Sequence, residues 1–273
     1  MDVSSNLMNI KKAIIVASFG TSYNETRAKT IDAIEADVAD AFEGWDVRRA
    51  FTSRMIIKKL KERDGVEIDY IDGALERLVN DGYEDVVVLP TLMFNGIEYE
   101  DIIRISSEFV PKFKSFHVAK PLLSEESDFD ELNKTILNEI RVESKELAGE
   151  DSSLILMGHG THHYSNGAFP EIQLKLFLTD AEDVFVTTVE GFPRFDDLDK
   201  MMARVTSKDV VLTPLMLVAG DHAMNDMIGD SPDSLRCILE SKGYDVHSIL
   251  KGLAEYESVR RIFIRHVQDS MTE

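Results

Sequence analysis

An internal repeat constrains the fold of this 273-residue chain more than any other sequence feature. Residues 13–21, an apolar run that ends in a Gly-Thr turn, resemble residues 154–161. Residues 87–93 resemble residues 210–216 in the same way. Because the similar segments follow one another in the same order, the chain is predicted to consist of two related halves.

Eight short apolar runs alternate with longer amphipathic stretches, four runs in each half. Alternation of strands and helices predicts parallel sheets with helices on both faces. A closed eight-stranded barrel is the alternative, and the repeat favours two separate four-stranded units. We therefore expect an α/β, bilobal fold of two pseudo-repeated halves. The predicted strands are residues 13–17, 47–51, 86–89, 116–119, 154–157, 184–189, 210–212 and 246–250.

The expected domain boundaries follow from this repeat. Residues 11–123 form the N-terminal half, residues 124–150 a connecting helical segment, and residues 151–273 the C-terminal half with the candidate metal site. The last helix, around residues 259–267, is expected to pack back on the first half. Two such halves normally bind their ligand in the cleft between them, beyond the carboxyl ends of the strands.

Composition argues against several functional classes. The chain has 30 Lys and Arg against 50 Asp and Glu, a net charge of −20, so nucleic acid and anionic membranes are unexpected partners. A single cysteine, Cys237, excludes an intramolecular disulfide or a cysteine-held metal cluster. The first twelve residues are polar and no apolar run reaches membrane-spanning length, so we expect a cytoplasmic protein. Without a phosphate-binding loop, no nucleotide is expected as a cofactor.

Three polar residues stand at strand ends of the second half: His159, Glu190 and, after the third strand, His222. Neighbouring parallel strands are about 4.8 Å apart, so three such ends can converge on one ion. Two imidazoles and a carboxylate suit divalent cobalt, nickel, iron or zinc, and three protein ligands leave coordination positions open. By the repeat, the first half has other residues at the matching positions, namely Phe19, Ser53 and Tyr99.

A histidine at a strand end can also simply cap a loop, and three such residues at matching positions favour metal binding over that explanation. His162 and His163 follow in the next loop and are expected to line the cleft or to join the cluster. A packing or surface role is expected for the remaining histidines, His117, His247 and His266.

Four segments together resemble a known family. Residues 157–163 read Met-Gly-His-Gly-Thr-His-His, and residues 218–227 read Val-Ala-Gly-Asp-His-Ala-Met-Asn-Asp-Met. With residues 18–22 and 50–56, they closely resemble the anaerobic sirohydrochlorin cobaltochelatases, class II chelatases that need no ATP. The resemblance extends over nearly the whole chain. It implies a bilobal chelatase fold and insertion of Co²⁺ into sirohydrochlorin on the anaerobic route to cobalamin.

The resemblance also implies that His159, Glu190 and His222 bind the metal and carry the insertion. Co²⁺ is then the substrate metal, with Fe²⁺ or Ni²⁺ as possible replacements. A histidine released from the ion, or Glu190, is expected to accept the pyrrole protons, because an imidazole titrates near neutral pH.

Four residues are candidates for binding the tetrapyrrole. Phe19 and Tyr99 are expected to form an apolar floor under the macrocycle, and His163 to line the cleft. Sirohydrochlorin carries eight carboxylates, and Arg54 is a candidate to hold one of them because arginine suits bidentate carboxylate contact.

Two other functions stay open from the sequence. One is a ferrochelatase, acting on sirohydrochlorin on the sirohaem route or on a porphyrin with fewer carboxylates. The other is a metal- or tetrapyrrole-binding protein without turnover, such as a metal carrier or a periplasmic-type binding module. The sequence also leaves open the physiological metal and whether the chain forms a homo-oligomer.

Overall fold

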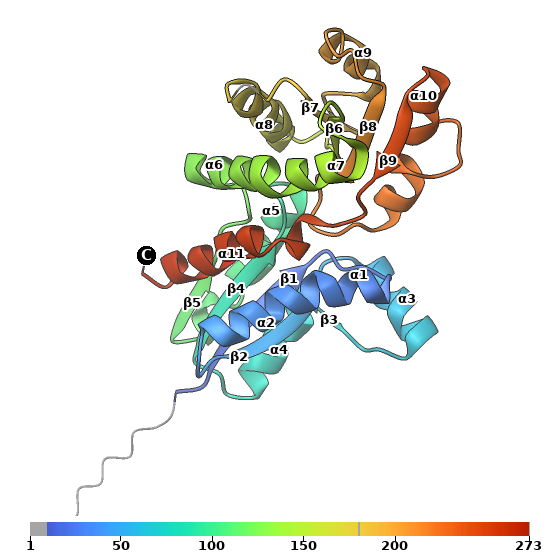
Figure 1. The fold of residues 1–273 in the computed structure, drawn as a ribbon. Coiled ribbons are helices and arrows are strands. Elements are labelled where there is room, and N and C mark those ends of the chain that lie inside the picture. Colours follow the sequence, from blue (N-terminus) through green and yellow to red (C-terminus); the bar gives the residue numbers. More distant parts are fainter. Residues whose placement is uncertain (1–9, 180, 273) are drawn as a thin grey trace, which may run out of the picture.

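The computed structural model describes residues 10–179 and 181–272 and contains two open parallel sheets (Figure 1). The strand order is β3-β2-β1-β4-β5 in the first sheet and β7-β6-β8-β9 in the second. This confirms the α/β class with two related halves and excludes the closed barrel. Most of the polar N-terminal segment, from which we expect no secretion signal, lies outside the described residues.

Each of the eight predicted apolar runs overlaps a strand. The strands of the first sheet are β1 (Lys12–Ser18), β2 (Asp46–Phe51), β3 (Asp69–Tyr70), β4 (Asp85–Thr91) and β5 (Ser115–Val118). Those of the second are β6 (Ser153–Gly158), β7 (Val184–Thr188), β8 (Asp209–Pro214) and β9 (Asp245–Ser248). The first sheet thus has five strands where four were expected, because the two-residue β3 is too short to leave a hydrophobic pattern.

Helices cover the sheets on both sides (Figure 1). The first half contains α1 (Asn24–Lys29), α2 (Ile31–Ala41), α3 (Arg54–Asp64), α4 (Ile71–Asn80) and α5 (Ile97–Ser107). The second contains α8 (Ala168–Phe177), α9 (Leu198–Met201) and α10 (Leu235–Ser241). Two crossing segments complete the fold, α6 (Glu126–Thr135) with α7 (Arg141–Ala148), and α11 (Glu257–Ser270). None of the described helices has the length and apolar character needed to cross a membrane.

One hydrophobic core is common to both halves. It takes Ile14 and Leu89 from one face of the first sheet, and Leu156 and Val211 from one face of the second. The opposite faces of the sheets pack in two separate cores. The central strand β1 is buried on both faces, and this explains its continuous apolar sequence.

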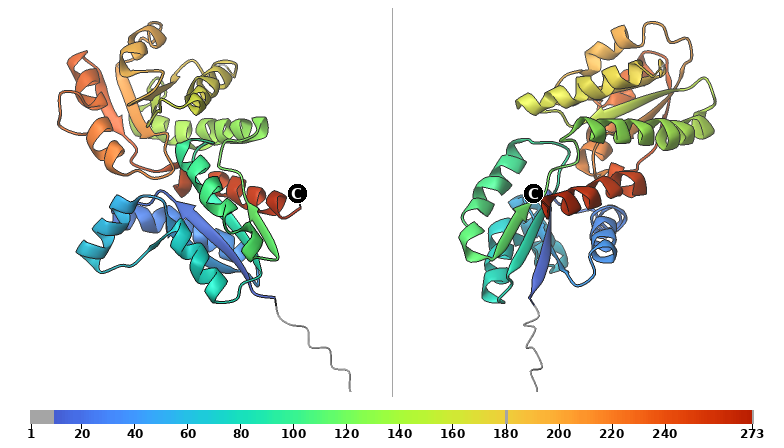
Figure 2. Two further views of the ribbon diagram at one scale, coloured as in Figure 1. Left: turned by 180° about the vertical axis from the view of Figure 1, so that it is seen from behind. Right: turned by 90° about the vertical axis from the view of Figure 1, so that its left-hand side faces the viewer.

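Each crossing segment packs on the half opposite to the one that it follows in the sequence. After β5, the chain runs through α6 into α7, which packs on β6 and β8 of the second sheet. After β9, α11 returns to pack on α2 and β4 of the first. Figures 1 and 2 show α6 and α11 running between the halves, and the two helices are in contact.

A buried carboxylate joins these two helices. Asp128 of α6 has no exposed surface, accepts a hydrogen bond from Arg265 at 2.7 Å, and lies 3.1 Å from Nε2 of His266. Burial raises the pKa of Asp128, but hydrogen bonds from His266, Arg265 and two backbone N–H groups outweigh it and hold the pKa well below its usual range. His266 therefore has the packing role expected for it.

Candidate functional site

The carboxyl ends of the two sheets repeat one backbone arrangement. The N–H of Ser53 donates to the carbonyl of Phe19 at 3.2 Å, and the N–H of Glu190 donates to the carbonyl of His159 at 2.8 Å. These matched hydrogen bonds make Phe19 the counterpart of His159 and Ser53 the counterpart of Glu190. The first two pairings expected from the sequence repeat therefore agree with the structure.

A glycine with positive φ follows in each half. Gly20 has φ 96° and Gly160 has φ 79°. A Cβ at Gly20 would come within 2.5 Å of the Phe51 ring, and a Cβ at Gly160 within 2.3 Å of the backbone nitrogen of Gly191. Both turns therefore require glycine, and each glycine lies two residues after the end of its strand.

The third pairing differs from the expected one by a single residue. Pro90 and Pro214 pair with corresponding residues of their central strands, so these two prolines are counterparts. Counting eight residues on from each proline gives Glu98 in the first half and His222 in the second. Glu98, and not Tyr99, is therefore the counterpart of His222. The prediction aligned two similar Leu-Met pairs, which are offset by one residue relative to the hydrogen-bonded register.

His159 and His222 lie against each other at this edge, although they are far apart in the sequence. Their ring centroids are 4.3 Å apart and the rings are nearly perpendicular, at 87°. Nδ1 of His159 lies 2.7 Å from the carbonyl of Gly160, and Nδ1 of His222 lies 2.7 Å from a carboxylate oxygen of Asp226. With Nδ1 engaged on both rings, Nε2 is the nitrogen that each ring can offer to an ion.

Glu190 lies beside this pair but does not complete it. Its backbone is hydrogen-bonded to His159, and its exposed side chain lines a hollow of about 370 Å³ together with His162 and Arg194. Among the described residues, its carboxylate does not form a group with both histidines in which all ligand atoms lie within 4.8 Å of one another. The structure thus brings two of the three predicted ligands together, with the third at the neighbouring strand end.

Asp226 is a residue of this site that the sequence analysis missed. It follows His222 by four residues, within a helical segment that includes the short π-helix Ala223–Met227. This spacing places two side chains on the same face, and it is the signal that could have revealed the pair. A carboxylate on the second ring nitrogen fixes the orientation of a metal-binding histidine and raises its basicity.

Two contacts bridge the halves beside the histidines. The hydroxyl of Tyr23 in the first half donates to a carboxylate oxygen of Asp221 at 3.3 Å. Nε2 of His163 lies 3.3 Å from a carboxylate oxygen of Glu100 on α5. His163 is therefore placed at the boundary between the halves. Its partner Glu100 was not among the predicted site residues.

The other predicted substrate residues lie on the first half. Phe19 is 47% exposed at the end of β1. Tyr99 is half-buried on α5, and this burial raises its pKa. Arg54 begins α3, with its guanidinium 3.9 Å from the centre of the Tyr70 ring and 3.7 Å from Asp72. The Arg54 side chain is 71% exposed, so it stays accessible to a ligand.

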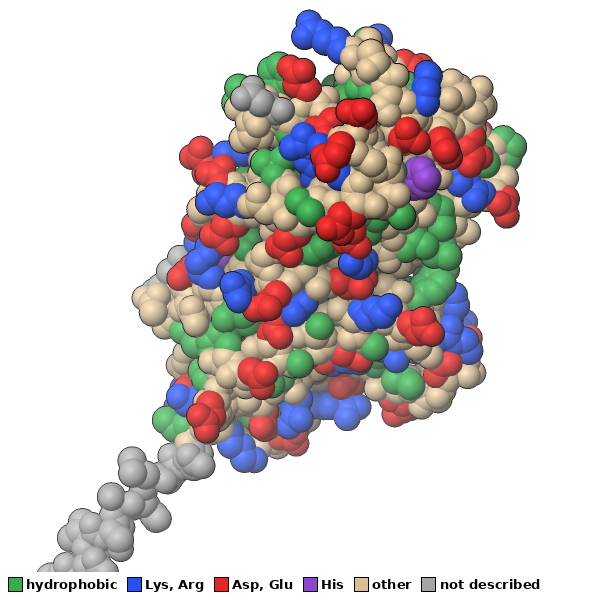
Figure 3. All heavy atoms as spheres, in the orientation of Figure 1, with side chains coloured by type: hydrophobic (Ala, Val, Ile, Leu, Met, Phe, Trp, Pro, Cys, Tyr) green, Lys and Arg blue, Asp and Glu red, His purple; other side chains and the backbone are tan. Residues whose placement is uncertain are grey.

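Large exposed apolar side chains occur in several segments that follow strands. On the face seen in Figure 3, hydrophobic side chains gather at the right, where the two halves meet. Exposed apolar patches of this kind mark binding surfaces. The exposed apolar residues in such segments include Phe19, Met55, Ile97, Tyr164, Phe192 and Met224. Two imidazoles and exposed apolar side chains therefore both occur in segments that follow strands.

Comparisons with known proteins identify the family of the chain. The sequence model of the family described as cobalt chelatase (CbiK) matches residues 12–272. The sirohydrochlorin cobaltochelatase of Salmonella typhimurium is 36% identical over 262 residues, which cover 96% of this chain and 97% of that protein. The sirohydrochlorin cobaltochelatase CbiKC of Nitratidesulfovibrio vulgaris is 28% identical over 260 residues, covering 94% and 89%.

Two solved structures share the fold. SirB from Bacillus subtilis with Fe³⁺ has a TM-score of 0.63 and 15% identity, with 96% of each chain covered. CbiX, described as the terminal enzyme for biosynthesis of sirohaem in denitrifying bacteria, has a TM-score of 0.54 and 18% identity, covering 95% of this chain and 99% of that one. At these identities, the two structures bear on the fold alone.

Proposed function

The chain belongs to the cobalt chelatase family, and from that premise we propose that it inserts Co²⁺ into sirohydrochlorin without ATP, on the anaerobic route to cobalamin. The proposed setting is the cytoplasm. One observation carries the proposal: the rings of His159 and His222, far apart in the sequence, meet with their centroids 4.3 Å apart. The exposed apolar side chains of neighbouring segments, such as Phe192 and Met224, are the surface that we propose for a flat macrocycle.

On the metal side, we assign Nε2 of His159 and Nε2 of His222 as the first two ligands. The exposed carboxylate of Glu190, on the neighbouring strand end, is the third after a change of side-chain rotamer. Three protein ligands leave positions for water, which the tetrapyrrole nitrogens can replace. Fe²⁺ and Ni²⁺ prefer similar ligands, so we propose that metal availability selects among them.

Insertion must also remove two protons from pyrrole nitrogens. As the tetrapyrrole nitrogens take positions on the ion one by one, they replace first its waters and then its protein ligands. A released imidazole, or the carboxylate of Glu190, is then a base near the proton that must leave. The hydrogen bond from His222 to Asp226 supports this role, because the carboxylate stabilises a protonated imidazole.

On the substrate side, we propose that the first half holds the macrocycle. Phe19 and Tyr99 contact its apolar surface, Arg54 binds one carboxylate, and His163 with Glu100 marks the edge of the cleft. Residues 11–123 and 151–273 would then be the two sides of the site, with residues 124–150 as their connection. Holding ion and ring in one orientation lowers the barrier by proximity alone, and this step uses no nucleotide.

An absorbance assay tests the proposal. Purified protein is mixed with sirohydrochlorin and Co²⁺ in the absence of nucleotide, and the spectrum is followed over many turnovers. We expect conversion to the cobalt product at a rate proportional to protein concentration and above the spontaneous rate. A spectral change that stops at one equivalent would instead indicate a binding protein. Conversion with Fe²⁺ and not with Co²⁺ would indicate a ferrochelatase.

A further inference from the structure

A second group of side chains of the types that bind metals lies at the amino ends of two strands of the second sheet, at the other end from His159 and His222. Asp209 begins β8, and Asp245 and His247 belong to the edge strand β9. Asp209 pairs with Asp245, and Val211 pairs with His247, in parallel register. Because side chains alternate along a strand, Asp209, Asp245 and His247 project from the same face of the sheet.

The ligand atoms of this group are close together. Nε2 of His247 lies 4.0 Å from an oxygen of Asp209 and 4.0 Å from an oxygen of Asp245. All three ligand atoms lie within 4.8 Å of one another, a condition that no other group of three such residues meets in the described part of the chain. The side chains are between 33% and 76% exposed, so an ion and its waters can reach them.

The two carboxylates carry uncompensated charge. Across residues 10–179 and 181–272, no lysine or arginine forms an ion pair with Asp209 or Asp245. The neighbouring Lys208 instead places its ammonium 4.4 Å from the centre of the Tyr244 ring. Like charges directly opposite each other on adjacent strands destabilise a sheet. A bound cation would convert this repulsion into a link between β8 and β9.

The first half provides an internal comparison at the matching positions. There, Asp85 pairs with Ser115 and Val87 pairs with His117. The hydroxyl of Ser115 lies 3.1 Å from Nε2 of His117, and Asp85 lies 3.8 Å from the ammonium of Lys12. The first half thus has one carboxylate, already paired with a lysine. The second half has two carboxylates beside the histidine and no such partner among the described residues.

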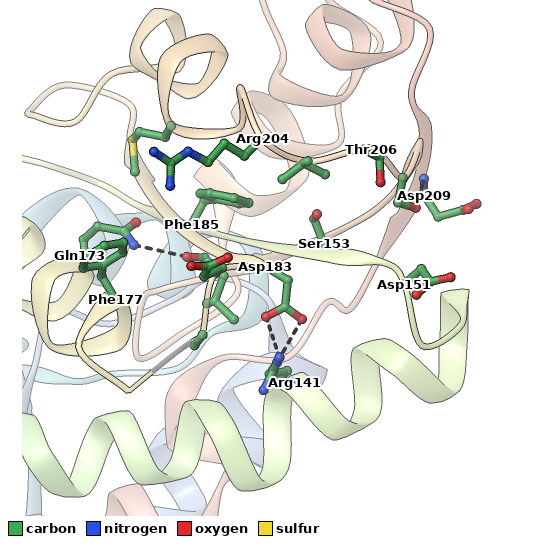
Figure 4. Close-up of a pocket in the computed structure, with 16 residues that line it drawn as sticks. Arg141, Asp151, Ser153, Gln173, Phe177, Asp183, Phe185, Arg204, Thr206 and Asp209 are labelled. Carbon is green, nitrogen blue, oxygen red and sulfur yellow. Dashed lines mark hydrogen bonds and ion pairs between the residues drawn. The ribbon is translucent and has the colours of Figure 1, made fainter.

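One member of the group, Asp209, also lines a cavity of about 840 Å³. Figure 4 shows Asp209 close to Thr206 at one side of this cavity, apart from the ion pair between Arg141 and Asp183. The Asp183 carboxylate is thus paired with an arginine. The Asp209 carboxylate instead lies near His247 and is partly exposed.

We propose that Asp209, Asp245 and His247 form a second divalent-cation site, separate from the cleft, which binds a borderline transition cation such as Co²⁺, Ni²⁺ or Zn²⁺. One imidazole with two carboxylates suits these ions. An ion about 2.1 Å from each ligand needs ligand atoms roughly 3 to 4 Å apart, so small rotations of the exposed carboxylates close the site. The ion stabilises the second sheet and takes no part in insertion. His247 then has a binding role in place of the packing or surface role expected from the sequence.

The test starts from the double variant His159→Ala/His222→Ala, which removes the cleft histidines. Equilibrium dialysis against Co²⁺ alone should find one ion per chain, and Co²⁺ should raise the thermal midpoint. Adding His247→Ala should weaken this binding at least about 10-fold, as should Asp245→Ser, which copies the first half. The matched control His117→Ala should leave the binding unchanged. In the otherwise native chain, His247→Ala should insert Co²⁺ at the native rate.

Three results would overturn the proposal. The first is that the cleft double variant binds no Co²⁺. The second is that binding persists in both His247→Ala and Asp245→Ser, or is lost equally in His117→Ala. The third is that Mg²⁺, which prefers all-oxygen sites, displaces Co²⁺ at equal concentration, because that would indicate a simple acidic patch. Circular dichroism and metal-free thermal midpoints establish that each variant is folded. Asp245 is 76% exposed, so its replacement should not disturb folding.

Discussion

The two halves have the same backbone arrangement around their central strands and differ in the side chains at the strand ends. At the carboxyl ends of the strands, corresponding hydrogen bonds and glycine turns present different groups. The first half has Phe19, Ser53 and Glu98 where the second has His159, Glu190 and His222. At the amino ends of the strands, the first half has Ser115 at the position where the second has Asp245. The repeat supplies the geometry, and a few replacements at strand ends give the second half its proposed metal ligands.

The largest expected effect concerns the cleft histidines. His159→Ala and His222→Ala should each lower the rate of Co²⁺ insertion by more than about 100-fold, because losing a direct ligand costs more than losing its support. Glu190→Ala should lower the rate strongly. Insertion rates on folded variants give the measurement. Phe19→Ala is the matched first-half control and should act mainly on the apparent affinity for sirohydrochlorin. Equal losses in rate from both halves would break the comparison.

The next prediction tests the contact between the two crossing helices, α6 and α11. Asp128→Ala should lower the free energy of unfolding by about 3–5 kcal/mol, because it leaves Arg265 and His266 without their buried partner. Urea unfolding at pH 7 measures this loss. Asp130→Ala on the same helix removes only an exposed ion pair with Lys175 and should change little.

The lowered pKa of Asp128 also fixes the direction of a pH effect. The stabilisation from its carboxylate is fully present above the unfolded pKa of about 3.9 and is lost as the pH falls from there toward the lower folded value. The difference in unfolding free energy between the native chain and Asp128→Ala should therefore shrink on acidification below pH 4. A difference that grows in acid would contradict the assigned hydrogen bonds.

A smaller effect separates support from ligation within the second half. Asp226→Asn should weaken Co²⁺ binding about 10- to 100-fold, because the ring of His222 loses its anionic partner. Calorimetric titration in the His247→Ala background, without tetrapyrrole, provides the dissociation constant of this site alone. Asp221→Asn alters a neighbouring carboxylate that accepts from Tyr23, and its effect on Co²⁺ should be smaller. If Asp221→Asn were the more damaging change, Asp226 would not have the supporting role.

The smallest effect compares the two glycine turns. Gly20→Ala and Gly160→Ala should each lower the unfolding free energy by about 1–3 kcal/mol through backbone strain, with more lost at Gly160 because its obstacle is the backbone of Gly191. Gly44 also has positive φ, but a Cβ there meets nothing within 4 Å, so Gly44→Ala reports strain alone. Chemical denaturation of the three variants gives the order. A larger loss at Gly44 would contradict the steric argument.

Much of the fold could be predicted because burial leaves a pattern. The central strands β1 and β6 are buried on both faces, so each appears as a continuous apolar run. The two-residue β3 leaves no such run. The pairing of His222 with Tyr99 was wrong by one residue, since sequence similarity does not report hydrogen-bonded register.

The histidines of the cleft were found because the repeat compares strand ends directly. Contacts between the halves, such as those of Tyr23 with Asp221 and of Glu100 with His163, depend on how the halves pack and have no local signal. The grouping of His247 with two aspartates likewise depends on strand pairing, which composition and spacing do not show.

The division of roles between the halves is tested most directly by titrating Co²⁺ in the absence of tetrapyrrole. Two variants are compared in a His247→Ala background, so that only the cleft is measured: His159→Ala/His222→Ala in the second half and Phe19→Ala/Glu98→Gln in the first. The account predicts that the second-half variant loses the ion, while the first-half variant binds one Co²⁺ with the affinity of its background. Retention of Co²⁺ by the second-half variant, or its loss from the first-half variant, would contradict it.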